Sequence, residues 1–420
     1  MRVEIVTIGD ELLLGFTIDT NAAHLARELA AIGVEIVHRA SVGDRAADIA
    51  SAVKAALGRS GGVITTGGLG PTSDDLTKPA IAALFGRELL RDERIVDAMK
   101  ARWRTLRRTG SFPESNVAQA MIPEGATILV NRHGSAPGIW LEDAEGRWVA
   151  MLPGVPREMR GMLAEELIPR IKDRSSGEGI MPSSVIRSLT LRTTGIAESA
   201  LADQLGVLAR GVDGLEFAFL PAVDGVDLRL TSRLLPPDEA DAALAAAAAR
   251  VRAAAARHIY GEGSSDLADI VLDMCRRRSL RIAVAESCTG GMLGARLTAI
   301  PGSSEVFVGG VIAYEDAVKR DWLGVPDEML QQHGAVSEAV AAAMASGIRQ
   351  RMKADIGIAL TGVAGPGGGT AAKPVGLVCM GMDGKTARAR SLRLFGTREE
   401  IRQRAVQAAL DDVRRTLEND

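Results

Sequence analysis

The feature that most constrains the fold is the alternation of short apolar runs with helical patterns near the start of the chain. Strand-like runs cover residues 2–8, 34–41 and 61–66, and helix-like segments cover 20–32 and 45–58. This order predicts a parallel sheet with helices on both faces. Ligands of such sheets bind beyond the carboxyl ends of the strands, so the loops there are candidate sites.

The last part of the chain repeats the alternation, and the part between the two differs. Strand candidates lie at 279–286, 304–314, 354–362 and 375–384. In between, SSGEG (175–179) is a predicted linker, and two antiparallel strands are predicted at 215–221 and 226–233, followed by an alanine-rich helix from residue 238.

The length of 420 residues exceeds what one hydrophobic core supports. We therefore predict an α/β protein in which two α/β domains with mainly parallel sheets are joined by a small α+β module. The predicted boundaries are 1–172, 173–257 and 258–420.

Composition excludes several classes of protein. The formal net charge is -3 and aromatic residues make up 3%, which argues against a basic nucleic-acid-binding face or a stacking platform. The three cysteines form no zinc pattern and suit a reducing compartment. No membrane-spanning run and no signal-peptide pattern are apparent. We expect a cytoplasmic protein with neither a nucleic-acid nor a membrane partner.

The stretch AVAESCTGGM (283–292) places two nucleophiles side by side where a predicted strand turns into a helix. Backbone N–H groups at such a turn can hold an oxyanion during acyl transfer, and Gly290 and Gly291 allow close approach of a substrate. Alternatively, Ser287 or Thr289 only caps the helix. From the residues alone Cys288 is also a candidate, because thiolates are the better nucleophiles.

A serine nucleophile needs a base. The last domain offers His258 and His333, both of which could equally be structural. The stretch 311–325 offers Lys319, five residues after Tyr314 at the end of a predicted strand. A desolvated lysine can take a proton from serine, and Ser-Lys pairs are known chemistry. Lys319 could also be a solvated helix lysine.

A glycine-rich loop, TGVAGPGGGT (361–370), follows another predicted strand. Its N–H groups could form an anion-binding nest, although no Walker A pattern is present and the loop could simply be flexible. Downstream, Arg398 and Arg402 lie four residues apart on one helix face, where they could bind phosphate or be solvated.

Acidic residues follow two strands of the first domain. Asp10 and Glu11 lie in IGDELLLG (8–15), and Asp74 and Asp75 lie in GGLGPTSDDLT (67–77). Carboxylates at one sheet edge suit Mg²⁺ bridging to phosphates, and the glycine-rich turn suits a pyrophosphate. Alternatively, Asp74 or Asp75 caps the helix that follows.

Together, the motifs of residues 258–415 resemble the CinA proteins, whose C-terminal domain is the PncC-type nicotinamide mononucleotide (NMN) amidohydrolase. The resemblance rests on AESCTGG, the Tyr314–Lys319 segment, HGAVS (333–337), TGVAGPGGGT with KPVG (373–376), and FGTR (395–398). It implies that the carboxamide of NMN is hydrolysed to nicotinic acid mononucleotide and ammonia without a cofactor. Ser287 would be the nucleophile, Lys319 the base and Tyr314 a positioning or relay residue.

The resemblance also implies a set of substrate contacts. The turn would hold the oxyanion, and the glycine-rich loop with one of the two arginines would hold the phosphate. These residues are Cys288, Thr289, Gly290, Thr361, Gly362, Ala364, Gly365, Gly367, Gly368, Arg398 and Arg402.

Residues 1 to about 170 resemble the N-terminal CinA domain, which looks like the MoaB/MogA molybdopterin-binding fold. The resemblance implies a metal-dependent ADP-ribose pyrophosphatase that yields AMP and ribose 5-phosphate. Its candidate site residues here are Asp10, Glu11, Gly67, Gly68, Asp74 and Asp75, with Asp10 and Asp74 as metal ligands. The family pattern carries Lys or Arg where Ala118 stands, and this departure is expected to weaken the N-terminal activity.

We therefore predict an enzyme of pyridine nucleotide recycling that binds NMN and ADP-ribose and, as the resemblance suggests, forms a homodimer. Two other hypotheses are a non-enzymatic nucleotide-binding accessory protein linked to competence, and a molybdopterin-handling protein. The latter follows from the N-terminal fold alone, and fold does not imply function.

Overall fold

The computed structural model describes residues 1–105, 111–177, 186–233 and 235–419. The chain divides into two compact units, Met1–Arg187 with Ser232–Asp241, and Ser188–Thr231 with Ala242–Asp420. Within the described residues, no helix combines the length and the apolar character needed to cross a membrane.

The first unit contains a six-stranded sheet and a separate strand pair. The strands are β1 Arg2–Ile8, β2 Glu35–Val42, β3 Gly62–Thr66, β6 Thr127–Leu129, β7 Gly138–Glu142 and β8 Trp148–Leu152, with the pair β4 Leu89–Arg91 and β5 Met121–Pro123. The sheet order is β2-β1-β3-β8-β7-β6. Its first four strands are parallel, and β7 and β6 continue it in antiparallel fashion.

Helices cover both faces of this sheet because its strands are apolar on both sides. Val3 and Ile5 of β1 belong to one core with the helices that carry Leu25 and Met159, whereas Val6 packs into a second core on the opposite face. The helices are α1 Asp10–Leu13, α2 Thr20–Ala31, α3 Ala46–Ser60, α4 Thr77–Leu84, α5 Glu93–Thr105, η1 Glu114–Ala120, α6 Pro156–Met162, η2 Leu163–Leu167 and α7 Ile168–Gly177.

The second unit begins with a small four-stranded module. Its elements are β9 Arg187–Thr193, α8 Glu198–Leu205, η3 Gly206–Arg210, β10 Glu216–Pro221, β11 Val226–Ser232, α9 Pro237–Ala255 and β12 Ile259–Glu262, and the strand order is β10-β11-β9-β12. Leu201 of α8 and Leu244 and Val251 of α9 join Leu228 and Leu230 of β11 in one core. The module is therefore a helix layer on an antiparallel sheet.

The rest of the second unit contains a five-stranded sheet in the order β14-β13-β15-β16-β17. Its strands are β13 Ile282–Glu286, β14 Phe307–Ile312, β15 Ile356–Gly362, β16 Leu377–Asp383 and β17 Arg388–Arg393. The first three in spatial order are parallel, and β16 and β17 are antiparallel additions. The helices are α10 Leu267–Arg277, α11 Met292–Thr298, η4 Ser303–Glu305, α12 Asp316–Leu323, α13 Asp327–His333, α14 Glu338–Met352 and α15 Arg398–Asn419.

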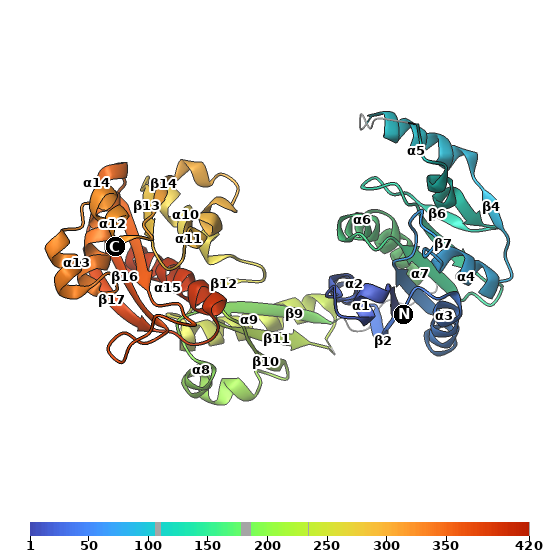
Figure 1. Cartoon of the computed structure of the whole chain (residues 1–420). Helices are drawn as coiled ribbons and strands as arrows, with labels where there is room; N and C mark the ends of the chain where they lie inside the picture. Colours follow the sequence, from blue (N-terminus) through green and yellow to red (C-terminus); the bar gives the residue numbers. More distant parts are fainter. Residues whose placement is uncertain (106–110, 178–185, 234, 420) are drawn as a thin grey trace. The chain divides into compact units, whose positions relative to one another are not determined.

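Alternate residues of β13 reach opposite cores of this domain. Ile282 and Val284 pack with α10, α11 and α15, and Ala283 and Ala285 pack with α12 and α14. Figure 1 shows these helices around the sheet. Helices cover both faces of the sheet. The loops that carry the predicted site residues therefore start from the carboxyl ends of β13, β14 and β15.

The α/β prediction is confirmed, and most predicted strands match observed strands within a few residues. One difference affects the site: residues 303–305 form a 3-10 turn and β14 ends at Ile312, so Tyr314 lies in a loop rather than at the end of a strand. The linker prediction for 175–179 is wrong at its start, because α7 continues to Gly177, and 178–179 lie outside the described residues. The three domain boundaries stay predictions.

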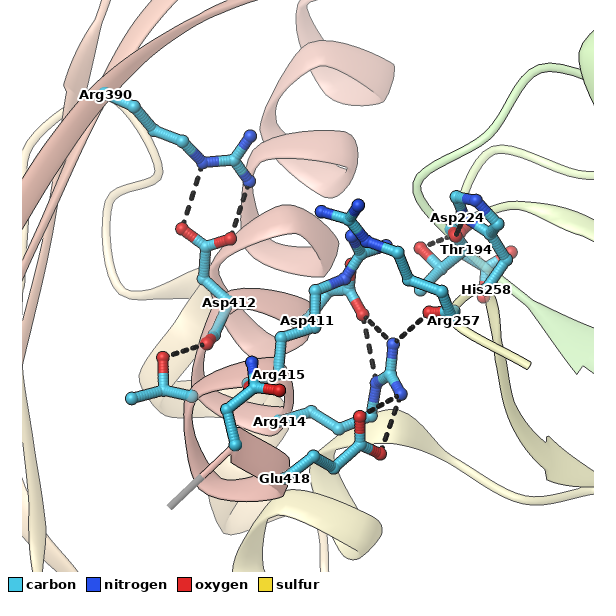
Figure 2. A network of polar contacts seen from close by, with 12 residues as sticks. Thr194, Asp224, Arg257, His258, Arg390, Asp411, Asp412, Arg414, Arg415 and Glu418 are labelled. Carbon is cyan, nitrogen blue, oxygen red and sulfur yellow. Dashed lines mark hydrogen bonds and ion pairs between the residues drawn. The ribbon is translucent and has the colours of Figure 1, made fainter. Parts of the chain in front are cut away.

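A buried ion-pair network on α15 attaches this helix to the small module (Figure 2). The guanidinium of Arg414, 1% exposed, contacts the carboxylate of Asp411 at 2.7 Å and donates to the backbone carbonyl of Arg257 at 2.9 Å. The same carboxylate pairs with Arg415 at 2.7 Å, and Glu418 pairs with Arg414 at 2.8 Å. The far end of α15 is therefore held by charges that water does not screen.

Replacing Arg414 should destabilise this unit strongly. Arg414→Met removes the charge but keeps much of the volume, and it leaves Asp411 buried with one partner fewer, so we expect a loss of about 3 kcal/mol in the free energy of unfolding. The matched control is Arg250→Met, which removes an exposed pair with Asp213 and should cost less than about 1 kcal/mol. Denaturant unfolding measures both, and equal losses would contradict the role given to the network.

Candidate functional site

The turn after β13 holds both candidate nucleophiles in a fixed backbone. The N–H of Ser287 donates to the carbonyl of Leu360 in β15 at 2.8 Å, and the N–H of Gly290 donates to the carbonyl of Ser287 at 3.1 Å. The residue that caps α11 is Gly291, and no side chain caps this helix from that position. The interpretation that Ser287 or Thr289 serves only as the cap is therefore wrong. Ser287 is 8% exposed, so its hydroxyl is largely enclosed.

Glu286 fills a role that sequence reasoning missed. Its buried carboxylate accepts from the N–H groups of Gly291 at 3.1 Å, Leu293 at 3.0 Å and Gly294 at 2.8 Å. The start of α11 is thus occupied by this carboxylate and is not free for a ligand. The signal was present: a carboxylate at the end of an apolar strand, one residue before the helix turn, needs buried donors.

Two other N–H groups of the turn remain free. Within the described residues, neither the N–H of Cys288 nor that of Thr289 donates a hydrogen bond to another residue, although the N–H of Cys288 interacts with its own thiol. They lie directly after Ser287, where a carbonyl attacked by its hydroxyl would develop negative charge. Two such donors are the minimum arrangement of an oxyanion hole.

Burial separates the two nucleophiles chemically. Cys288 belongs to the apolar core below the turn, and this desolvation raises the pKa of its thiol to about 12. A thiol with that pKa is protonated at neutral pH and is a poor nucleophile. The structure therefore favours Ser287 over Cys288.

Lys319 lies on α12 with its side chain 1% exposed, so the interpretation as a solvated lysine is wrong. Its Nζ donates to the backbone carbonyl of Tyr314 and to the carboxylate of Asp316, each at 3.1 Å. The N–H of Ala313 donates to the carbonyl of Glu286 at 2.7 Å, which brings the Ser287 turn beside the loop that Lys319 contacts. Among the residues described, no hydrogen bond joins Lys319 to Ser287 directly.

The two histidines are placed elsewhere. His333 ends α13 with its ring exposed, and its backbone carbonyl accepts from Lys373 at 2.6 Å. His258 lies in the small module, where Nδ1 contacts the carbonyl of Thr194 at 3.3 Å and burial lowers the pKa of the ring. Neither ring makes a hydrogen bond to Ser287 or to the loop after β14 in the described part of the chain. Lys319 contacts that loop through the carbonyl of Tyr314, beside the Ser287 turn, and is therefore the better candidate for the base.

Both arginines of the candidate phosphate site connect to the same region. Arg398 donates to the carbonyl of Gly365 at 2.6 Å and to the hydroxyl of Tyr314 at 3.3 Å, which links the glycine-rich loop to the loop after β14. Arg402 donates to the carbonyl of Thr289 at 2.8 Å. The side chain of Tyr314 is 61% exposed and contacts Arg398, whereas Lys319 contacts only its backbone.

The glycine-rich loop offers several free donors. The hydroxyl of Thr361, at the start of the loop, donates to the carbonyl of Ala335 at 2.9 Å. Beyond it, five N–H groups of this loop donate no hydrogen bond within the described residues, and these belong to Ala364, Gly365, Gly367, Gly368 and Gly369. Such a loop can hold a phosphate.

In the first unit, a cavity of about 450 Å³ lies at the carboxyl ends of β1 and β3. Its lining includes five of the predicted residues, namely Glu11, Gly67, Gly68, Asp74 and Asp75. Asp10 is not part of this lining. It exchanges hydrogen bonds with Asp44, which does line the cavity, through the backbone N–H of each residue at 2.9 and 3.3 Å.

The loop beside this cavity is shaped by its own contacts. Asp75 accepts from the N–H groups of Gly70 at 2.7 Å and Thr72 at 2.8 Å. The cap of α4 is Leu76 and involves no side chain, so the interpretation of Asp74 or Asp75 as helix caps is wrong. Gly67 has φ +110, and a Cβ there would lie 2.1 Å from the carbonyl oxygen of Ile8.

A lysine amine lies next to Ala118, the position at which the chain departs from the family pattern. The buried Nζ of Lys78 donates to the carbonyl of Ala118 at 2.6 Å, and desolvation lowers the pKa of this lysine to about 8. In the described ranges, no three or more His, Cys, Asp or Glu side chains form a group that could hold a metal ion by themselves.

Comparison with known proteins accounts for almost the whole chain. The family models "Probable molybdopterin binding domain", "Damage-inducible protein CinA KH domain" and "CinA C-terminal domain" match residues 4–173, 188–261 and 264–417. A CinA-like protein of Gemmatimonas aurantiaca is 62% identical over 419 residues, which cover 99% of this chain and 96% of the relative. A CinA-like protein of Kosmotoga olearia is 40% identical, with 99% of each chain covered.

Several solved structures are similar over part of the chain. A competence/damage inducible protein from Agrobacterium tumefaciens is 40% identical and covers 36% of this chain and 93% of its own, with a TM-score of 0.35. Because the three family models follow one another along the chain and the curated relatives match it end to end, the chain belongs to the CinA family.

Proposed function

We propose that the C-terminal domain hydrolyses the carboxamide of NMN to nicotinic acid mononucleotide and ammonia, with Ser287 as nucleophile and Lys319 as base. The observation that carries this proposal is the pairing of an enclosed serine, followed by two free N–H groups, with a buried lysine in the adjoining loop region. Lysine is almost never fully buried unless it is paired, and the amine of Lys319 on α12 is paired in the free protein with the carbonyl of Tyr314 and the carboxylate of Asp316.

The mechanism uses groups of this chain alone. Lys319 takes the proton of Ser287 as its Oγ bonds to the carboxamide carbon, and the N–H groups of Cys288 and Thr289 hold the resulting oxyanion. Lys319 returns the proton to the amide nitrogen and ammonia leaves. Water, deprotonated by the same lysine, then hydrolyses the ester and releases the carboxylate product. No cofactor is needed.

For this reaction Lys319 must turn from Asp316 toward Ser287. The carboxylate of Asp316 is 59% exposed and is therefore free to move into solvent when substrate arrives.

The two arginines suit different tasks. Arg398 is exposed and donates a hydrogen bond to the glycine-rich loop, whose free N–H groups suit a phosphate. We therefore assign the phosphate contact to Arg398. Arg402 is half-buried and already bonded to the backbone of the Ser287 turn, so it supports the turn.

For the N-terminal domain we propose a pyrophosphatase acting on ADP-ribose. The cavity at β1 and β3 supports this assignment, because it combines glycine-rich backbone with the carboxylates of Glu11 and Asp74. A divalent cation such as Mg²⁺ keeps water and takes few protein ligands when phosphates supply the rest, which fits this sparse set of carboxylates. Glu11 and Asp74 would hold the cation, which would polarise the phosphoryl oxygens, whereas Asp10, outside the lining of the cavity, is not retained as a ligand.

Substitution of the two adjacent nucleophiles tests the amidase directly. Ser287→Ala should lower kcat for ammonia release from NMN by at least about 10³-fold, because the nucleophile is gone. Cys288→Ala should stay within about threefold of wild type, since its buried thiol is protonated and takes no part in the reaction. A coupled ammonia assay measures both, and the reverse pattern would refute the assignment.

Thiol alkylation gives an independent test through pH. The pKa of Cys288 is raised to about 12, so its reactive thiolate is on the order of one part in 10⁴ at pH 8 and grows only as the pH rises toward 12. Iodoacetamide at pH 8 should therefore leave the NMN activity intact. Rapid inactivation at pH 7–8 that NMN prevents, with the label on Cys288, would show a thiolate nucleophile.

Metal removal tests the N-terminal proposal. With Mg²⁺ present, the protein should release AMP from ADP-ribose, and EDTA should abolish this release. Asp74→Asn should lower the rate by about 10-fold or more, because it removes a negative oxygen ligand. The control, Asp48→Asn, changes an exposed carboxylate on α3 and should have little effect. Chromatography of the nucleotides measures both rates, and turnover unaffected by EDTA would contradict the metal assignment.

A further inference from the structure

We propose that Glu286 is a positioning residue of the amidase, whose carboxylate occupies the N–H groups at the start of α11 and so leaves those of Cys288 and Thr289 as the oxyanion donors. The inference rests on the proposed amidase function and adds a residue that neither touches the substrate nor takes a proton.

The carboxylate of Glu286 is fully engaged by backbone. One oxygen, Oε2, accepts from the N–H groups of Gly291 and Leu293, and Oε1 accepts from that of Gly294 at 2.8 Å. The side chain is buried, and no cation pairs with it among the described residues. Its charge is therefore balanced by three backbone dipoles at a helix start, where a carboxylate is most stable.

Occupation of these donors has a chemical consequence. A helix start that is free attracts any anion, and here it would lie within four residues of the donors that the reaction needs. A substrate carbonyl or phosphate bound there would be misplaced with respect to Ser287. Because Glu286 fills this position, the only free N–H groups of the turn in the described structure are those of Cys288 and Thr289.

The turn is also fixed mechanically from both ends. The backbone carbonyl of Glu286 accepts from Ala313 in the loop after β14, and its side chain holds the first turn of α11. Arg402 donates to the carbonyl of Thr289, which fixes the Thr289–Gly290 peptide directly after the two donors. A donor misplaced by 1 Å costs about 10²-fold in rate, so this clamp bears directly on catalysis.

The same carboxylate acts on the unused thiol. Its negative charge adds to the desolvation that raises the pKa of Cys288, which shows that Glu286 lies close to the turn electrostatically as well as geometrically. Burial is the larger cause of this raised pKa, and the carboxylate of Glu286 adds to it besides positioning the oxyanion donors.

If Glu286 only stabilised the helix start, its substitution would lower thermal stability and leave kcat unchanged. The variant Glu286→Gln separates this possibility from a role in positioning the oxyanion donors. The amide keeps one acceptor oxygen but offers an NH₂ to N–H groups, which cannot accept a hydrogen bond. We expect kcat for NMN to fall about 100-fold, as for the loss of an oxyanion donor. KM should stay within about threefold of the wild-type value. The Kd of NMN, measured for Glu286→Gln combined with Ser287→Ala, should stay within about threefold of the value for Ser287→Ala alone.

The matched control is Asp266→Asn. Asp266 caps α10 of the same domain by accepting from the N–H of Ala268 at 2.7 Å, and it pairs with Arg296 of α11 at 3.2 Å. Its change therefore weakens a helix start and a contact of α11 without altering the N–H groups of the turn. It should lower the melting temperature as Glu286→Gln does while kcat stays within about twofold of wild type. If Glu286→Gln does not fold, Glu286→Asp, which keeps the charge but shortens the reach, is held to the same kcat criterion.

The outcomes are distinct. A wild-type protein that releases no ammonia from NMN refutes the proposed function and the inference with it. If the wild type is active and the Glu286 variant keeps kcat within about threefold, or differs only by a higher KM and a lower melting temperature, the role of Glu286 is refuted. The proposed function is then unaffected.

Discussion

The site depends on the parallel pairing of β13 with β14. In this register Glu286 lies opposite Ile312, and the N–H of Ala313 continues the ladder to the carbonyl of Glu286. Parallel strands end at the same edge of a sheet, so the turn that begins at Ser287 and the loop that leads to Lys319 start from neighbouring points. Pairing of β13 with β15 on its other side adds the glycine-rich loop to the same edge.

Burial then determines which groups can react. The apolar core beneath the turn raises the pKa of the Cys288 thiol, which supports the proposed use of the Ser287 hydroxyl as the nucleophile. The amine of Lys319 is enclosed against a carbonyl and a carboxylate that it can exchange for substrate. On this account, the chemistry follows from how deep each group lies and from which backbone donors stay free.

Much of this could be predicted from the sequence, because strand ends and the turns after them are encoded locally. The alternation of apolar runs predicted the sheets. It also placed AESCTGG, the segment before Lys319 and the glycine-rich loop at the ends of predicted strands. The burial of individual side chains could not be predicted. Whether Lys319 is solvated, for example, depends on the packing of α12 against residues far along the chain. The amine of Lys78 beside Ala118 was missed for the same reason, as it is a tertiary contact. The partners of Glu286 lie only five to eight residues along the chain, and they were missed although the local signal was present.

The most direct measurement of the central claim is a crystal structure of the Ser287→Ala variant with NMN. The account predicts the carboxamide carbon above position 287, its oxygen between the N–H groups of Cys288 and Thr289, and the phosphate on the 364–368 loop beside Arg398. A nucleotide bound in the opposite direction, or with its carboxamide away from Lys319, would contradict it.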